Sequence, residues 1–423
     1  MPDPLEEAPA APPTGSFAAL AHLEYRRLWV SGFLVFFAVM AQNIARGWLA
    51  LEITGSNAGL GGVLMGFGVL MLVATPFGGV AADRLSKRLV VLAATALLGF
   101  TSGVIGLAVL ADAIEYWMLV VASGLQAVAF AFFGPARMAF ISELLPDATV
   151  GNGIVLGQMS AEASRVVGPA IAGLLIGVLA DGTATVFLLS AALSAVSFVL
   201  CLTLPPGHAV AGRPARSVLG EIGDGVAYVR QHDGLRLLVL TSLGVVILGF
   251  PYIAFLPTLA DEIFDVGSGG YGFMSAVSAA GAVVAALLTA RTVGPVRQVR
   301  DLGRAGLLFG AAVVVLGAAP HFAVALGVLA FAGAAGLWFQ TTNQSLLLSI
   351  GAFEFHGRIQ SLVMLGFSGF GIAALPLGVL ADAIGLRTTF ALMGGVVALI
   401  SLLFVRRSGP ALGPSLRTFE PPV

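Results

Sequence analysis

Twelve apolar stretches run through this sequence, and short charged or Pro/Gly-rich segments separate them. A helix that rises about 1.5 Å per residue needs about 20 apolar residues to cross a hydrocarbon core of about 30 Å. Only 10% of the 423 residues are charged and 58% are hydrophobic, whereas a soluble domain carries about 25% charged residues. We therefore expect an all-α membrane protein with twelve transmembrane helices. The predicted spans lie near 28–52, 59–82, 89–111, 116–140, 152–180, 184–203, 235–259, 270–291, 302–319, 321–345, 357–381 and 387–405.

An internal repeat divides the spans into two groups of six. The string GVLAD ends the fifth span at 177–181 and the eleventh at 378–382. Many secondary transporters consist of two such halves, with the substrate site between them near the bilayer midplane. We expect two pseudo-symmetric six-helix bundles. The predicted segments are a disordered tail at 1–22, the first bundle at 23–203, a linker at 204–234, the second bundle at 235–406 and a tail at 407–423.

The basic residues predict the orientation. With the N-terminus inside, eighteen of the 21 basic residues fall in inner loops and tails, Arg137 among them. The outer turns carry acids such as Asp112 and Asp181 instead. By the positive-inside rule, both termini are expected in the cytoplasm, and the chain is expected in the inner (plasma) membrane.

The linker carries an amphipathic pattern. Val218, Leu219, Ile222, Val226 and Val229 fall on one helical face. This spacing favours a helix that lies on the inner membrane surface. The alternative is a mostly flexible linker.

Ionisable side chains inside a span are costly and therefore indicate function. Glu162 and Arg165 lie one turn apart in the fifth span, so they can meet. They are candidates to bind substrate, with Glu162 as a proton carrier, or they form a pair that only neutralises two charges. Arg46 of the first span is a candidate to attract an anionic group. Its alternative roles are an outer gate with Asp261 or Glu262, or snorkelling to the interface.

Uncharged polar residues in the spans are further candidates to line a cavity, although such residues also bond helix to helix. These candidates are Gln126, Gln158, Gln340 and Asn343. The sequence shows no nucleophile triad, metal cluster or phosphate-binding loop. We therefore expect no enzyme activity, no cofactor or metal, and no binding of ATP or nucleic acid.

Two motifs stand at the ends and bends of the spans. The loop after the second span reads Gly78-Gly79-Val80-Ala81-Ala82-Asp83-Arg84-Leu85-Ser86-Lys87-Arg88. The fifth span contains Gly168-Pro169-Ala170-Ile171-Ala172-Gly173, in which proline removes a backbone hydrogen bond and lets the helix bend. Further stretches are Gly47–Ser56, Gly134–Arg137 with Glu143–Pro146, and Phe355–Leu362.

These stretches resemble the major facilitator superfamily, and in particular its drug and siderophore exporter branch, which includes enterobactin exporters and macrolide efflux proteins. The resemblance covers residues 20–405. Ser86 stands where the family usually has glycine.

The resemblance implies a major facilitator fold and efflux of a small amphipathic drug, macrolide or siderophore by proton antiport. It assigns Gly79, Asp83, Arg84, Lys87 and Arg88 to a conformational latch between the halves. It also makes the Gly168, Pro169 and Gly173 string an antiporter motif. The expected partners are this substrate, the proton and the lipid bilayer. The alternatives are a lysophospholipid transporter of the same fold and a non-transporting membrane sensor or scaffold.

Overall fold

The computed structural model describes residues 15–207, 218–289, 295–351 and 355–416, and twelve of the helices in this part are long and apolar enough to cross a membrane. The first six form the N-half: α1 (Leu23–Thr54), α2 (Asn57–Arg84), α3 (Lys87–Leu110), α4 (Tyr116–Leu144), α5 (Asp147–Val178) and α6 (Gly182–Leu202). The C-half begins with α8 (Asp233–Gly249), which continues through the short helices η2 (Phe250–Phe255), α9 (Leu256–Thr258) and η3 (Leu259–Ile263). It is completed by α10 (Gly267–Thr289), α11 (Pro295–Ala318), α12 (Phe322–Ile350), α13 (His356–Ile384) and α14 (Leu386–Leu416). The predicted fold class and all twelve spans are confirmed.

The junction between α1 and α2 shows how the local sequence sets these bounds. Gly55 has φ +57°, a left-handed conformation that side chains disfavour, and it ends α1. The hydroxyl of Ser56 then accepts a hydrogen bond from the amide of Gly59 at 3.1 Å and caps α2. Two residues thus reverse the chain between neighbouring spans.

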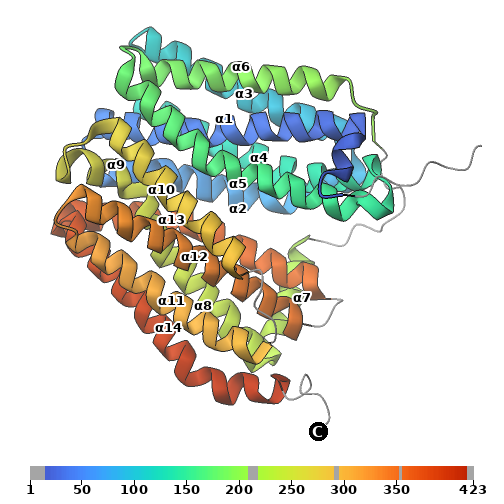
Figure 1. The fold of residues 1–423 in the computed structure, drawn as a ribbon, viewed down its shortest axis with the longest axis vertical. Coiled ribbons are helices and arrows are strands. Elements are labelled where there is room, and N and C mark those ends of the chain that lie inside the picture. Colours follow the sequence, from blue (N-terminus) through green and yellow to red (C-terminus); the bar gives the residue numbers. More distant parts are fainter. Residues whose placement is uncertain (1–14, 208–217, 290–294, 352–354, 417–423) are drawn as a thin grey trace, which may run out of the picture.

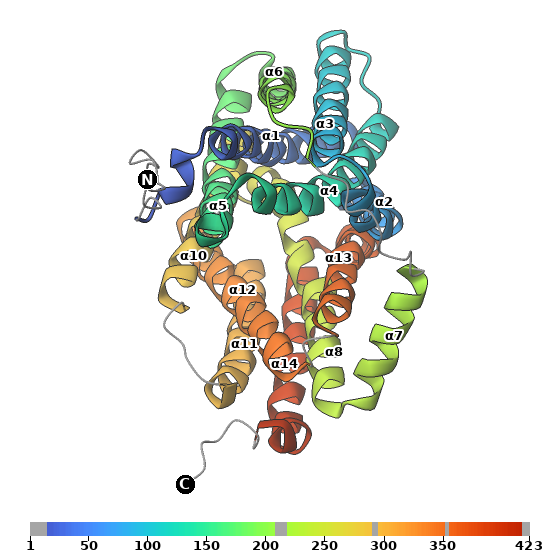
Figure 2. The same cartoon turned by 90° about the vertical axis from the view of Figure 1, so that its right-hand side faces the viewer.

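The two halves meet along two pairs of antiparallel helices. Figure 2 shows α2 beside α13 and α5 beside α10. Figure 1 shows the halves meeting at one end of the molecule and diverging toward the other. Helices from opposite halves therefore form the seams that close one end.

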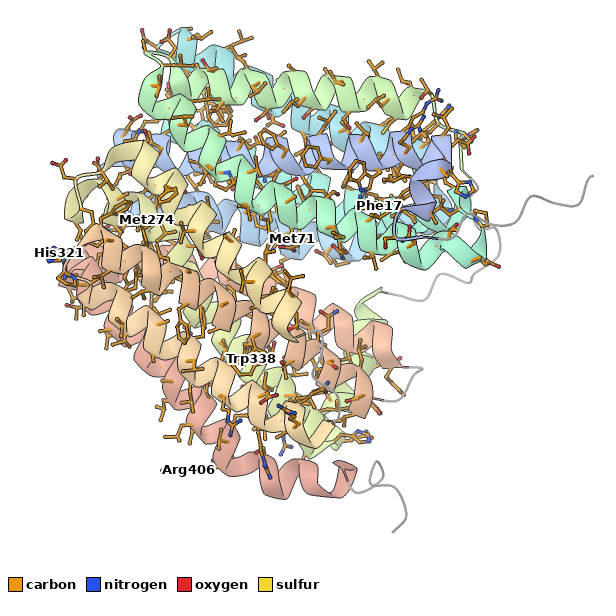
Figure 3. All side chains as sticks on the ribbon, viewed as in Figure 1. Phe17, Met71, Met274, His321, Trp338 and Arg406 are labelled. Atoms are coloured by element: carbon orange, nitrogen blue, oxygen red, sulfur yellow. The ribbon has the colours of Figure 1, made fainter. Side chains whose placement is uncertain are left out.

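Charge distinguishes these two ends. We call the end where α1 begins and α14 finishes the basic end, and the other the acidic end. Figure 3 shows Arg406 at the basic end and His321 at the acidic end. The acidic end also carries carboxylates in its turns and helix ends: Glu52, Asp112, Glu115, Asp181, Asp261, Glu262, Asp265 and Asp382. The closed end in Figure 1 is the acidic end.

Glycines bring the backbones together at the seams. A Cβ on Gly173 of α5 would lie 2.7 Å from Cα of Gly272 on α10. A Cβ on Gly371 of α13 would lie 2.7 Å from Cα of Gly68 on α2. No side chain larger than hydrogen fits at these positions without movement of the facing helix. The glycine content of the sequence therefore serves helix packing.

The predicted tails are shorter than expected. Residues 15–22 include the short helix η1 (Ala18–Ala21), which docks on α5: Asn152 accepts from the amide of Ala19 at 3.0 Å and donates to the carbonyl of Ser16 at 2.8 Å. At the other terminus α14 runs to Leu416, because the arginines at 406 and 407 end the apolar run without ending the helix.

The amphipathic linker helix forms, as α7 (Val218–Gln231), and it packs against α8 and α13 of the C-half. Figure 2 shows it alongside α8 at the edge of the C-half. Val229 is buried, Val226 packs against the C-half core, and the ring of Tyr228 stacks on Phe355 with centroids 3.9 Å apart. Its described apolar face is thus covered by protein. The side chains of Val218, Leu219 and Ile222 lie outside the described part.

Arg137 is a further correction, because it lies inside α4 and not in a loop. Its side chain is 6% exposed and lies between Gly32 of α1 and Gly157 of α5, with its guanidinium carbon 5.5 Å from the ring centre of Phe36. Nε and Nη2 have no hydrogen-bond partner among the described residues. A buried arginine cannot be told from a loop arginine by charge counting alone.

Candidate functional site

A pocket of about 390 Å³ lies between the two halves. The N-half contributes α1 and α5, and the C-half contributes η2, α9, α10, α12 and α13. The apolar part of the wall consists of Met40, Ile44, Pro169, Phe250, Ile253, Leu256, Leu337 and Phe370, with small residues of α10 and α12. The polar part consists of Asn43, Glu162, Arg165, Tyr252, Tyr271, Ser275, Ser278 and Gln340. The pocket is thus amphipathic.

Glu162 and Arg165 face this pocket from the middle of α5. Arg165 Nε lies 3.8 Å from Glu162 Oε1, and the side chains are 56% and 35% exposed, Arg165 being the more exposed. The predicted meeting of the two residues is confirmed. Their separation is at the outer limit of an ion pair, so either charge can turn to a ligand.

Arg46 lies behind the pocket wall in a polar network. Its guanidinium is 4% exposed and donates to Gln126, to Gln42 Oε1 at 3.2 Å and to Asn43 Oδ1 at 3.5 Å. Gln126 also donates to Asn43 at 3.2 Å, and the hydroxyl of Ser102 on α3 donates to Gln42 at 3.0 Å. Because Asn43 lines the pocket, it connects this buried charge to the cavity.

The alternatives expected for Arg46 are wrong. It pairs with neither Asp261 nor Glu262, and it does not reach an interface, because its side chain points into the N-half. Within the described part of the chain its partners are amide oxygens, and its Nε has no partner. The charge is solvated by neutral groups and not by a carboxylate.

Of the remaining polar candidates, two lie in or directly behind the pocket and two lie away from it. Gln340 lines the pocket, and Gln126 belongs to the network behind it. Gln158 is exposed one turn along α5 toward the basic end, and Asn343 is 2% exposed in the C-half, with its Oδ1 unpartnered among described residues. Neither of these two lines the pocket.

Three hydroxyl-bearing side chains of α10 that line the pocket were not predicted from the sequence. Tyr271, Ser275 and Ser278 all line the pocket, and Ser278 Oγ lies 3.1 Å from the hydroxyl oxygen of Tyr252. Their spacing of four and three residues places them on one helical face. That periodicity was available in the sequence and would have identified them.

The predicted latch residues make contacts inside the N-half. Lys87 is 2% exposed, and its Nζ lies 2.9 Å from Glu143 Oε1 of α4. Arg88 donates to the carbonyl of Leu204 at 2.7 Å. Ser86 caps α3 and donates to the carbonyl of Pro206, a role that glycine could not fill. Arg84 is exposed.

Two further latch residues complete this end of α2. A Cβ on Gly79 would meet nothing within 4 Å. The side chain of Asp83 lies outside the described part of the structure.

The predicted helix-bend string lies at the α5–α10 seam. Gly168 packs against Met40 of α1, where a Cβ would lie 2.8 Å from the Met40 Cβ. The carbonyl of Pro169 lies 2.6 Å from the Cβ position of Gly272, which also meets Gly173. The string therefore sits where the halves touch.

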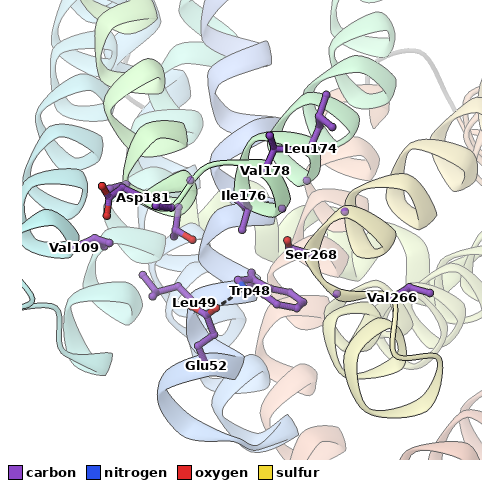
Figure 4. A pocket seen from close by; sticks show the side chains of 18 of the residues that line it. Trp48, Leu49, Glu52, Val109, Leu174, Ile176, Val178, Asp181, Val266 and Ser268 are labelled. Atoms are coloured by element: carbon purple, nitrogen blue, oxygen red, sulfur yellow. Dashed lines mark hydrogen bonds between the residues drawn. The ribbon is translucent and has the colours of Figure 1, made fainter.

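A second cavity, of about 740 Å³, opens at the acidic end, between the ends of α1, α3 and α5 and the starts of α6 and α10. Figure 4 shows Trp48, Glu52 and Asp181 in its wall, with Trp48 Nε1 donating to Glu52 at 2.6 Å. Gly173 lines this cavity and Pro169 lines the central pocket. About one turn of α5 separates the two.

A carboxylate joins the halves at the acidic end. Asp382 of α13 accepts hydrogen bonds from the backbone and side-chain amides of Asn57, at 2.8 and 2.9 Å, and from the amide of Ala58 at 2.8 Å. These are the first residues of α2, whose N-terminal amides and positive dipole end favour an anion. Asp382 thus caps a helix of the opposite half.

Among the described residues, no three His, Cys, Asp or Glu side chains lie close enough together to hold a metal ion. Twelve spans in two halves around an amphipathic pocket are the architecture of a membrane carrier. The fold agrees with a solved structure of a bacterial homologue of the human lysosomal transporter Spinster, described as inward-facing and occupied. The TM-score is 0.74 at 14% identity, covering 97% of this chain and all of that chain. The two chains therefore share one fold.

Sequence comparison places it more closely. The chain belongs to the transmembrane secretion effector family, which matches residues 14–412. It is 24% identical to the staphyloferrin A transporter of Staphylococcus aureus, over 88% of this chain and 94% of that protein. It is 27% identical to the multidrug efflux pump Tap of Mycobacterium tuberculosis, over 88% and 92%. It is 22% identical to macrolide efflux protein A of Streptococcus pyogenes, over 78% and 82%. The resemblance drawn from the motifs is confirmed.

Proposed function

We propose that this protein exports a small amphipathic molecule by alternating access, with proton entry as the driving reaction. The observation that carries the proposal is the pocket between the halves. It combines one loosely paired carboxylate, Glu162, with an aromatic and hydroxyl-bearing wall. The relatives named for multidrug and macrolide efflux and for staphyloferrin A transport support export and support substrates of this size and kind.

The two cavities support alternating access. In this conformation the α5–α10 seam, with Gly173 against Gly272, lies between the central pocket and the cavity at the acidic end. Because the seam is made of small residues, its parting exposes little apolar surface. If the halves rock so that this seam opens, the central pocket connects to the acidic end.

Orientation assigns the two sides. The basic end is proposed to face the cytoplasm under the positive-inside rule, with both termini inside and the chain in the inner (plasma) membrane. The halves diverge toward that end in Figure 1. This conformation is then the one that loads substrate from the cytoplasm.

Glu162 is the proposed proton carrier. The ionised carboxylate holds Arg165 only loosely, and a proton from the outside neutralises it and releases Arg165. Ionisation of a group at the bilayer midplane is costly, so its charge state changes the relative stability of the two conformations. Proton and substrate then occupy the pocket in alternation.

The latch region, Gly79 to Arg88, is proposed to join the halves at the basic end in the opposite conformation. Here that end is open, and Lys87 and Arg88 bind partners of their own half. These contacts hold the backbone of the latch region in a fixed conformation while it is not bound to the other half.

The test is accumulation of labelled macrolides, a catecholate siderophore and a lysophospholipid in an efflux-deficient bacterium. Wild-type protein should lower accumulation of one class, and Glu162→Gln or a protonophore should abolish the effect. Glu24→Gln, which removes an exposed carboxylate outside the pocket, is the matched control and should export normally.

Three results contradict parts of the proposal. Flux that stays coupled to the pH gradient in Glu162→Gln removes Glu162 from the mechanism. Movement of lysophospholipid alone replaces drug export with the lipid-transporter alternative. No flux of any compound favours a scaffold that does not transport.

A further inference from the structure

A row of arginines lies on the outer face of the C-half at the basic end. Arg297, Arg300 and Arg304 of α11 recur at intervals of three and four residues, so they share one helical face. All three are exposed, as is Arg406 of α14. We call these four residues the arginine stripe. Figure 3 shows Arg406 at this end of α14.

The same helical faces continue as apolar surface toward the acidic end. On α11 the stripe is followed, at helical spacing, by Leu308 and Val315, which are 39% and 48% exposed. On α14, Leu399 and Leu402 precede Arg406 at the same spacing and are 54% and 37% exposed. Each helix thus presents a basic end above an apolar strip.

Packing brings the two strips together. α11 and α14 run antiparallel in close contact, with Gly303 against Val405 and Gly310 against the backbone of Gly394. Arg304 and Arg406 follow Gly303 and Val405 directly, so they stand at one level of the bundle. The two strips therefore lie on neighbouring helices beneath a single basic rim.

The charge of this rim is largely uncompensated. One carboxylate faces it: Asp301, 9% exposed, lies 3.7 Å from Arg304. Among the described residues no carboxylate lies within 4 Å of Arg297, Arg300 or Arg406. Lys87 of the N-half, by contrast, is buried against Glu143.

We propose that the arginine stripe and the apolar strips beneath it bind an anionic phospholipid, with the headgroup phosphate on the arginines and the acyl chains along the strips. Guanidinium groups match phosphate oxygens in charge and in paired hydrogen-bond geometry. In a membrane, a phospholipid places its phosphate at the level where the apolar surface ends, which is where the stripe lies. The site lies apart from the central pocket and does not depend on the proposed transport function.

The test measures binding of dioleoyl phosphatidylglycerol to the purified full chain in neutral detergent, with dioleoyl phosphatidylcholine as the matched zwitterionic lipid. The variant is Arg297→Gln/Arg300→Gln/Arg406→Gln, which keeps Arg304 so that the buried Asp301 retains its partner. Each arginine near an anionic lipid contributes about five-fold in affinity, so the triple change should weaken phosphatidylglycerol binding by about 100-fold. Binding by wild type should also fall steeply with added salt.

The control is Arg26→Gln/Arg230→Gln/Arg236→Gln, which removes three exposed charges scattered over α1, α7 and α8. It should bind phosphatidylglycerol as wild type does, and millimolar inorganic phosphate should not displace the lipid. Equal loss in control and variant, equal binding of phosphatidylcholine, or displacement by inorganic phosphate would each overturn the proposal. If the triple variant fails to fold, two measurements on the wild type still test the proposal. These are its preference for phosphatidylglycerol over phosphatidylcholine and the loss of phosphatidylglycerol binding with added salt.

Discussion

Closure of the acidic end should depend on the carboxylate of Asp382. It reaches from α13 of the C-half to the first two amides of α2 in the N-half and accepts three hydrogen bonds there. Asp382→Asn keeps one acceptor oxygen and loses the charge, whereas Asp382→Ala loses both. We expect both variants to favour separation of the halves at the acidic end, and alanine to do so more strongly.

The magnitude follows from the contacts. Loss of a capping side chain costs about 1 kcal/mol, and loss of an exposed anion at a helix N-terminus costs about 0.5 kcal/mol. Hydrogen bonds to a charged acceptor each contribute about 1.5 kcal/mol when they are shielded, and less at this exposed site. We expect about 1 kcal/mol for asparagine and about 2 kcal/mol for alanine, or roughly five-fold and thirty-fold changes in the ratio of closed to open molecules.

Spin-label distance measurements can read this ratio. Labels are placed on cysteines at Ala113 and His321, exposed acidic-end positions of the two halves, after Cys201→Ala removes the native thiol. The control is Asp181→Asn, because Asp181 is the repeat counterpart of Asp382, and among the described residues its side chain has no hydrogen-bond or ion-pair partner. The reasoning is refuted if the distances in both Asp382 variants match wild type, or if Asp181→Asn shifts them equally.

Three further changes follow from the packing. Gly173→Val should prevent closure of the acidic end, because even a Cβ would lie 2.7 Å from Cα of Gly272. The same spin-label pair should report a longer distance in this variant. An unchanged distance would contradict the close approach of α5 and α10. Lys87→Met should lower the free energy of unfolding by about 3 kcal/mol, because it removes a buried cation 2.9 Å from the Glu143 carboxylate; Lys87→Met with Glu143→Gln should recover much of that loss in thermal melts. Arg46→Met should lower the melting temperature, because it deprives three amide side chains of their shared donor, and a melt equal to wild type would show the network to be dispensable.

Sequence patterns predicted the spans because each span is long and almost purely apolar. The boundaries were less accurate where a helix continues past its charges. Arg406 and Arg407 mark the end of the apolar run, yet α14 continues to Leu416. Charge indicates where a helix leaves the lipid, and this differs from where the helix ends.

The site was predictable only where its residues are neighbours in the chain. Glu162 and Arg165 share one helix, so their meeting followed from spacing. The bond from Arg46 to Gln126 on α4, and the bond from Ser102 on α3 to Gln42, depend on how three helices pack, and a single sequence carries no such information. For the same reason the sequence suggested carboxylate partners, Asp261 and Glu262, where the fold supplies amides.

The repeat itself shows how equal sequences take unequal roles. GVLAD ends both repeats, but α5 stops at Val178 while α13 continues to Ile384. Asp181 is therefore left in a turn, whereas Asp382 remains helical and reaches α2. Asp382 accepts three hydrogen bonds that join the halves at the acidic end. Close backbone packing and side-chain contacts, such as Pro257 and Tyr271 against Gly47, add to the closure at that end. Asp382 is therefore a contact at that end whose directional bonds a single substitution removes.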